Sequence, residues 1–154
     1  MIKITLNDTQ AKQQLKEIAV SLKRPEKMYG VIGETLKKIH TQRFKDEKSP
    51  DGQKWQALSP KTLERKRKKG KSTKILRQDG YLVKKLAYNY NERGVEFGSG
   101  EKYARLHHFG GKAGRGHKIT IPARPWLGLN QNNEDLILSK AKTLLSRQIA
   151  QILR

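Results

Sequence analysis

Any catalytic or metal chemistry in this chain would depend mainly on its histidines and hydroxyl groups, because the sequence contains no cysteine. The lack of cysteine excludes a disulfide framework, a thiolate metal site and a cysteine nucleophile. The four histidines are His40, His107, His108 and His117. Because His107 and His108 are adjacent, they point to different faces of a helix, and no carboxylate cluster lies nearby to complete a metal site. We therefore expect no bound metal, and we expect His107 to be buried and hydrogen-bonded.

Two glycine-containing stretches resemble catalytic or phosphate-binding motifs only superficially. The Gly-Ser-Gly stretch at 98–100 lacks the strand-to-helix pattern of a nucleophile elbow, and no partner acid accompanies it. The stretch at 110–116 has neither Walker A nor dinucleotide-binding spacing. It is more typical of a long mobile loop, at about residues 110–117, that becomes ordered against a partner. The sequence therefore predicts no catalytic residue and no cofactor.

Basic residues dominate the charged composition, with 34 Lys and Arg against 14 Asp and Glu and a formal net charge of +20. Between Lys61 and Arg77 there are nine basic residues and one acid, Glu64. Because like charges repel and no apolar face interrupts them, this segment predicts a solvated helix end and a flexible loop, at about residues 65–74. The candidate contacts to a partner or polyanion come from this segment and from the Gly-rich loop: Arg65, Lys66, Arg67, Lys68, Lys69, Lys71, Lys74, Lys112 and Arg115.

A charge of this size favours contact with a polyanion, which is either nucleic acid or an acidic protein surface. Direct DNA binding is one interpretation of the basic cluster. However, aromatic residues that could stack on bases are not interleaved with it, and no helix-turn-helix or zinc-finger pattern is present. At most, non-specific phosphate binding is supported. An enzyme acting on a polyanion is a further interpretation, and it lacks an acid/base pair with suitable spacing.

The amino-terminal part predicts a short strand and two amphipathic helices. Apolar and polar residues alternate over residues 2–6, as in a strand, and Asn7 or Asp8 can cap the helix that follows. The first helix has apolar residues at intervals of four, three and four: Ala11, Leu15, Ile18 and Leu22. Pro25 opens the second helix, which reaches about Phe44. Its apolar face consists of Met28, Ile32, Leu36 and Ile39.

The middle of the chain predicts further helical segments and a hairpin. Trp55 and Leu58 are expected as buried anchors, and Ser59 caps a helix whose first residue is Pro60. A short helical turn then returns apolar residues to the core: Ile75, Leu76, Tyr81, Leu82 and Leu86. Alternating apolar residues on either side of a four-residue turn at 91–94 predict a β-hairpin.

A short helix and a third strand are expected next. Tyr103, Leu106 and Phe109 fall at helical spacing, so one helix face would bury all three. Gly110 would end this helix, because glycine readily adopts the left-handed conformation. The Ile-Thr-Ile sequence at 119–121 predicts a half-buried strand. Together with the hairpin, this strand predicts an antiparallel sheet of at least three strands.

A closing helix is expected to start near Asn133 or Glu134. Its buried face consists of Leu138, Ala141, Leu145, Ile149 and Ile152, and Leu144 and Leu153 widen this stripe toward a partner subunit. The predicted fold is α+β: one domain over residues 1–154, with an antiparallel sheet of three or more strands packed against amphipathic N- and C-terminal helices. No apolar run could span a membrane and no signal-peptide pattern opens the chain, so we expect a cytoplasmic protein without membrane contact.

Four motifs, in order between about Phe44 and Leu129, are similar to those of a known family. They are Trp55-Gln-Ala-Leu58-Ser59-Pro60, Ile75-Leu76-Arg-Gln-Asp79-Gly80-Tyr-Leu82, Tyr103-Ala104-Arg-Leu106-His107-His108-Phe109-Gly110 and Pro122-Ala-Arg124-Pro125-Trp126-Leu127-Gly128. In this order they resemble the phage virion morphogenesis or tail-completion family of Mu-like and related contractile-tailed phages and prophages. The motif core comprises Trp55, Leu58, Leu76, Gly80, Leu82, Tyr103, Ala104, His107, Phe109, Gly110, Pro122, Arg124, Pro125, Trp126 and Leu127.

The resemblance implies a single tail-completion-like domain with a non-enzymatic role in phage or prophage virion assembly. It implies tail completion and head–tail joining at the head-proximal end of the tail, with other tail or neck proteins as partners. The expected mechanism is self-association into a ring through the apolar helix stripes, closed by repeated head-to-tail contacts. The expected location is the cytoplasm of the bacterial host during assembly, with the virion tail as a further location. The alternative function is a basic, non-sequence-specific DNA-binding protein that contacts DNA weakly.

Overall fold

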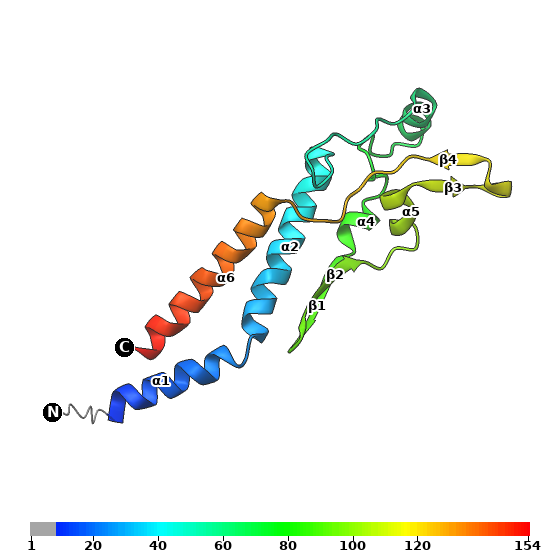
Figure 1. Cartoon of the computed structure of the whole chain (residues 1–154). Coiled ribbons are helices and arrows are strands. Elements are labelled where there is room, and N and C mark those ends of the chain that lie inside the picture. Colours follow the sequence, from blue (N-terminus) through cyan, green and yellow to red (C-terminus); the bar gives the residue numbers. More distant parts are fainter. Residues whose placement is uncertain (1–8) are drawn as a thin grey trace.

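The computed structural model describes residues 9–154, which form helices and two small sheets (Figure 1). The elements in chain order are α1 Thr9–Leu22, α2 Glu26–Asp46, α3 Pro60–Lys68, α4 Tyr81–Lys84, β1 Leu86–Asn91, β2 Gly94–Ser99, α5 Ala104–Phe109, β3 Gly111–Ala113, the 3-10 helix η1 Arg115–His117, β4 Ile119–Ile121 and α6 Gln131–Ile152. The predicted strand at 2–6 and the caps Asn7 and Asp8 lie outside the described residues. The prediction of an α+β fold is confirmed.

The long helix α2 lies at the centre of the molecule, with α6 on one side and the β1–β2 hairpin on another (Figure 1). Helix α1 precedes α2 and contacts α6. Gly33 allows the hairpin to approach α2 closely, because a Cβ at this position would overlap the ring of Tyr88. The Tyr88 hydroxyl then donates a hydrogen bond to Glu34 Oε1 at 2.8 Å. The predicted second helix is therefore the element against which α6 and the hairpin pack.

One aromatic and aliphatic core joins α2 to the segments that follow it. Its buried members are Phe44, Trp55, Ile75, Leu82, Leu86, Ala104 and Trp126. The ring centroid of Phe44 lies 5.4 Å from that of Trp55 and 6.0 Å from that of Trp126. Trp55 is buried as predicted, and the partly buried Leu58 packs against the same core. Tyr81, a predicted core residue, is instead 56% exposed.

The strands form two separate antiparallel pairs, so the prediction of one sheet with three or more strands is not confirmed. Strands β1 and β2 pair from Leu86–Ser99 to Asn91–Gly94, which leaves a turn of two residues rather than the predicted four. Strand β4 pairs with β3 in the predicted Gly-rich loop, and not with the hairpin. A Cβ on Gly110 (φ +72°) would meet Ala123 N at 2.7 Å and Ile121 O at 2.9 Å. This close approach places the chain after Gly110 beside β4, where it becomes the partner strand.

The short helix α5 forms as predicted, but it buries a different face. Ala104 is 6% exposed, whereas Tyr103 is 38% and Phe109 is 69% exposed. This face of α5 joins the core at Trp126, whose indole Nε1 donates to Ala104 O at 3.0 Å. The expected burial of Tyr103 and Phe109 is therefore wrong. The same holds for Ile119, which is 56% exposed on the short β3–β4 arm.

The two terminal helices present apolar residues that nothing in the described chain covers. In α1, Leu15 is 65% and Leu22 is 53% exposed. Helix α6 starts at Gln131, two residues before the predicted start, because Asn130 and Asn133 form a reciprocal capping box. Its predicted buried stripe is only half-buried, and Leu138 is 56% exposed. Within residues 9–154, no helix combines the length and the apolar character needed to cross a membrane.

Candidate partner-binding groove

Arg43 of α2 fixes the segment that leads into α6. Its Nη1 donates to Trp126 O at 3.0 Å and to Gly128 O at 2.7 Å, and its Nη2 donates to Asn133 Oδ1 at 3.0 Å. Arg43 is 6% exposed, and these three acceptors are uncharged. Burial lowers the pKa of the Arg43 guanidinium. The arginine thus serves as a structural hydrogen-bond donor that ties α2 to α6.

His40 lies one helical turn before Arg43 and holds the same segment. Its Nδ1 donates to Leu36 O at 2.7 Å, and its Nε2 accepts from Gly128 N at 3.3 Å. This pair of bonds requires the neutral ring with hydrogen on Nδ1. Burial, and secondarily the charge of Arg43, lowers the pKa of His40 to about 4. At neutral pH the ring is therefore an uncharged part of the core.

The segment 122–128 is held on its other side by Trp55 and Arg124. Trp55 Nε1 donates to Pro125 O at 2.8 Å. Arg124 Nε donates to Gln56 O at 2.8 Å, and Arg124 N donates to His107 O at 2.8 Å. Arg124 is 6% exposed, and burial lowers the pKa of its guanidinium. The segment therefore connects the residues after Trp55, helix α5 and helix α2 in one hydrogen-bonded unit.

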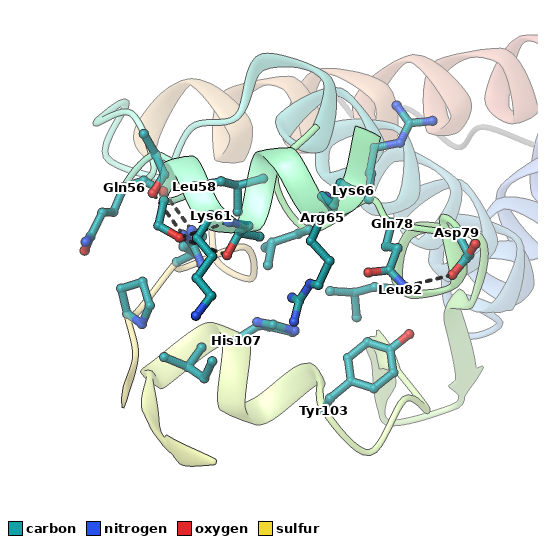
Figure 2. Close-up of a pocket in the computed structure, with 18 of the residues that line it drawn as sticks. Gln56, Leu58, Lys61, Arg65, Lys66, Gln78, Asp79, Leu82, Tyr103 and His107 are labelled. Carbon is teal, nitrogen blue, oxygen red and sulfur yellow. Dashed lines mark hydrogen bonds between the residues drawn. The ribbon is translucent and has the colours of Figure 1, made fainter. Parts of the chain in front are cut away.

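This unit forms one wall of a groove of about 1220 Å³, and α3 forms the opposite wall. Figure 2 shows Lys61 and Arg65 on the α3 side, and His107 and Tyr103 on the side of α5. Ser59 caps α3 as predicted, since its Oγ accepts from Thr62 N at 3.2 Å. The wall that presents the basic residues is therefore a formed helix with a regular start. The groove combines cationic side chains with apolar ones.

The structure brings together only part of the predicted contact set. Arg65, Lys66, Lys68 and Lys69 line the groove, whereas Arg67, Lys71 and Lys74 do not. Lys71 Nζ forms an ion pair with Asp79 Oδ1 at 2.5 Å. Lys112 in β3 and Arg115 in η1 are exposed on the β3–β4 arm and lie outside the groove. The predicted set thus divides into a groove group and an arm group.

Lys66 is a correction to the prediction of a solvated segment. It is 6% exposed, and its Nζ donates to Lys74 O at 2.8 Å. Burial lowers the pKa of the Lys66 amine, and the carboxylate of Glu47 partly opposes that shift. The lysine is buried because it lies on the face of α3 that turns toward the chain segment carrying Lys74 and Ile75. The mobility of residues 65–74 and of residues 110–117, like the single domain over 1–154, stays a prediction.

The motif residues fall into three groups by exposure. The buried ones are Trp55, Leu82, Ala104, Arg124 and Trp126. The half-buried ones are Leu58, Leu76, Gly80, His107, Gly110, Pro122 and Pro125. The exposed ones are Tyr103, Phe109 and Leu127. The motifs therefore meet around Trp126, although three of their members face outward.

Sequence reasoning missed the roles of His40 and Arg43. Both residues continue the helical spacing of the predicted stripe in α2, four and seven positions after Leu36. That spacing could have indicated their roles, since a polar side chain on a buried helix face needs a hydrogen-bond partner inside the protein.

The two adjacent histidines of α5 have different environments. His108 Nδ1 accepts from Trp126 N and from Leu127 N, each at 3.3 Å. His107 is half-buried, and its buried Nδ1 has no hydrogen-bond partner within the described residues, contrary to the prediction. Burial, and then the charge of Arg124, lowers the pKa of His107. In the described part of the chain, no group of three or more His, Asp or Glu side chains could hold a metal ion.

These features describe a small, basic α+β protein with a cationic groove and uncovered apolar helix faces. The chain belongs to the phage virion morphogenesis family, whose model matches residues 6–146. It is 47% identical over 57 residues to "Mu-like prophage FluMu G protein 2" of Haemophilus influenzae, a match covering 37% of this chain and 41% of that protein. It is 27% identical over 124 residues to "Putative capsid assembly protein G" of Escherichia phage Mu, covering 79% of this chain and 80% of that protein.

No solved structure is significantly similar to the chain. The match to the Haemophilus protein spans about two fifths of that relative, whereas the match to the phage Mu protein spans most of it. The resemblance seen in the four motifs is thus confirmed at the level of the family. Membership in this family supports a role in phage virion assembly.

Proposed function

We propose that this protein is a non-enzymatic assembly factor that completes the phage tail and joins it to the head. It acts at the head-proximal end of the tail, in the cytoplasm of the host, and its partners are other tail or neck proteins. The family supports the assembly role, and the name of the phage Mu relative points in the same direction. The observation that carries the proposed mechanism is the uncovered apolar surface of α1 and α6.

That surface consists of several exposed aliphatic side chains on the two helices. The side chains that are more than two fifths exposed include Leu15, Val20 and Leu22 in α1 and Leu136 and Leu138 in α6. Leu153, which follows α6, is 54% exposed. Since α1 and α6 contact each other, these residues belong to neighbouring elements. Each Å² of apolar surface removed from water contributes about 25 cal/mol, so a second subunit covering this region would be stabilised.

A ring requires a second, different surface on each subunit. The β3–β4 arm extends from the body of the molecule on the side away from α1 and α6 (Figure 1). It exposes Ile119, and Phe109 at the base of the arm is 69% exposed. Contact between the arm of one subunit and the α1–α6 surface of the next is head-to-tail, and such contacts close into a ring when the rotation allows. Assembly then needs no catalytic group.

Light scattering of the purified protein, alone and with tail tubes, tests self-association. We expect a mass above that of one chain, rising with concentration or on addition of tubes. Leu15→Ser together with Leu138→Ser should reduce this mass. The control is Lys16→Ser together with Lys140→Ser, at exposed positions of the same two helices and with a similar cost in helix propensity, and it should not reduce the mass. A strict monomer at all concentrations and with tubes would contradict the proposal.

The second candidate function is non-specific DNA binding. The observation that favours it is the exposure of Arg65, Arg67, Lys68 and Lys69 along α3 and its end. Such a cluster should bind duplex DNA with a dissociation constant on the order of 10⁻⁴ to 10⁻⁶ M at physiological salt, and this binding should weaken steeply as salt rises. Titration of random and phage-derived duplexes at two salt concentrations separates the candidates. Tight, salt-resistant binding to one sequence would favour DNA binding over assembly.

A further inference from the structure

The groove between α3 and α5 carries an excess of positive charge. Seven Lys and Arg residues line it, against two acids, Glu64 and Asp79. Both acids are already paired: Glu64 with Lys68 at 2.7 Å, and Asp79 with Lys71 at 2.5 Å. Lys71 lies outside the lining, so Asp79 is neutralised from beyond the groove. The remaining cations, among them Lys61 and Arg65, have no acidic partner within residues 9–154.

Two of the lining cations lie beneath the surface of the groove. Arg124 and Lys66 are each 6% exposed, and their hydrogen bonds go to backbone carbonyls. Neither forms an ion pair in the described part of the chain. A charge that is poorly screened by water acts more strongly on a neighbouring anion than an exposed charge does. An anionic ligand in the groove would therefore interact with buried as well as exposed positive charge.

Part of the remaining lining is apolar. Leu58, Leu82 and Ile121 contribute aliphatic surface, and Figure 2 shows Leu58 and Leu82 among the lining side chains. The volume of about 1220 Å³ exceeds the range of about 300 to 1,000 Å³ that is usual for small-molecule sites. An extended peptide presents side chains alternately to opposite sides. Acidic side chains could then meet the cations while apolar ones rest on the aliphatic surface.

The aromatic end of the groove disfavours a nucleic acid strand. Tyr81 and Tyr103 line this end, where bases would have to stack. Burial, and then the nearby carboxylates of Glu101 and Asp79, raises the pKa of the Tyr103 phenol. Lys85 Nζ lies over the ring of Tyr81, 6.0 Å from its centroid. Glu101 is itself paired with Lys85, and Asp79 with Lys71, so neither carboxylate is left free to repel an acidic peptide. Lys85 occupies one face of the Tyr81 ring, where a base would have to stack.

We infer that this groove binds an extended, acidic peptide segment, with interspersed apolar side chains, from another virion protein. The inference deepens the proposed assembly function and rests on it for the source of the partner. It assigns the groove to a neighbouring protein of different sequence, while the apolar faces of α1 and α6 remain the surface for self-association. The α1–α6 surface lies away from the groove (Figure 1), so these two surfaces can be occupied at once. The arm, whose Ile119 also lines the groove, would adjoin the bound peptide.

Fluorescence anisotropy with defined probes tests the inference. The probe is a labelled peptide of alternating Glu and Leu, about 12 residues long, which spans at most about 40 Å when extended. The comparison peptide has Gln in place of Glu. We expect the acidic peptide to bind about tenfold more tightly than the Gln peptide at physiological salt. Lys61→Ala with Arg65→Ala should weaken binding of the acidic peptide by about fivefold or more.

The matched control is Lys37→Ala with Lys38→Ala, which removes the same charge from exposed positions of α2 outside the groove. This control should change binding by less than about twofold. Equal binding of the two peptides, no binding of either, or equal effects of the two double variants would overturn the inference. So would an oligothymidine of matched charge that binds more tightly than the peptide and depends on Lys61 and Arg65, since the groove would then be a nucleic acid site.

The self-association assay on the same Lys61 and Arg65 variant separates this inference from the proposed function. A variant that has lost peptide binding but keeps its oligomeric mass supports two independent surfaces. If the peptide result fails while the mass stays above that of one chain, the groove assignment is wrong and the assembly role stands. If the protein is a strict monomer and the acidic peptide still binds through Lys61 and Arg65, the proposed self-association fails and the groove assignment stands.

Discussion

The guanidinium of Arg43 lies 3.0 Å from the carbonyl oxygen of Trp126, a residue 83 positions later in the chain. The same arginine reaches Gly128 O and Asn133 Oδ1, so one side chain of α2 fixes both the end of the motif core and the start of α6. Because α6 carries much of the uncovered apolar surface, Arg43 connects the stability of the core to the surface proposed for self-association.

Replacing Arg43 should therefore destabilise the fold strongly. Arg43→Ala leaves three acceptors without their donor, and we expect the free energy of unfolding to fall by roughly 3 kcal/mol or more. Urea denaturation measures this. Lys45→Ala, at an exposed position of the same helix, should change the free energy of unfolding by less than about 0.5 kcal/mol. Equal effects of the two substitutions would show that the bonds of Arg43 contribute little.

The two aromatic residues of the adjoining motifs should differ in their contribution to stability. Trp126 is 3% exposed and packs against Phe44, so Trp126→Ala should cost roughly 3 to 5 kcal/mol. Phe109 is 69% exposed, so Phe109→Ala should cost less than about 1 kcal/mol. If Phe109→Ala still reduces assembly, its ring acts as a contact. A loss of stability for Phe109→Ala as large as that for Trp126→Ala would contradict the structure.

The comparison of Trp126 with Phe109 also shows which features of the fold can be predicted from the sequence. Glycine, proline and capping residues act locally, and so the helix after Ser59, the hairpin and the end of α5 at Gly110 could be predicted. The buried face of α5 is the one that carries Ala104, whose carbonyl oxygen accepts from the indole of Trp126, 22 positions later in the chain. Periodicity alone favoured the larger side chains of Tyr103 and Phe109.

Pairing between strands could not be predicted either, because it also depends on contacts between distant parts of the chain. Short strands can pair with any edge that lies near them, and the partner of β4 is fixed by the close approach of Gly110 to Ala123. The groove shows the same limitation. The density of basic residues indicated that α3 contributes to a binding site. The sequence did not indicate that Lys66 is buried or that Arg124, 58 positions after Lys66, lines the same groove.

His40 should make stability depend on pH in the acidic range. Its pKa is about 4 in the folded protein against an ordinary value of 6.5, so the unfolded chain binds more protons between these values. The contribution of His40 is therefore fully present above about pH 6.5, and it is lost as the pH falls toward 4. The expected loss is about 3 kcal/mol.

Urea denaturation of the wild type and of His40→Gln between pH 4 and pH 7 measures this contribution. The variant should show a smaller loss of stability over that range, because glutamine does not take up a proton. His107 and His108, whose pKa values are also lowered by burial, remain in both proteins and cancel in the comparison. Identical pH dependence in the two proteins would show that His40 does not become charged on unfolding.

The basic residues at the end of α3 should separate into one structural and several surface groups. Replacing Arg67, Lys68 and Lys69 with Ser should leave thermal stability nearly unchanged, since the exposed ion pair of Lys68 with Glu64 contributes at most a few tenths of a kcal/mol. Lys66→Ser should destabilise by roughly 1 to 3 kcal/mol, because Lys74 O loses its buried donor. Thermal unfolding of both variants measures these two changes in stability. Unfolding of the triple variant would show that the whole segment is structural.

The central claim is that this protein is needed to assemble the virion. The most direct measurement is electron microscopy of lysates from a phage or prophage that lacks the gene for this chain, with the gene supplied in trans as the control. We expect heads and tails to remain separate without the gene. The wild-type chain should restore joined particles, and the Leu15→Ser and Leu138→Ser variant should not. Joined, infectious particles at wild-type numbers without the gene would contradict it.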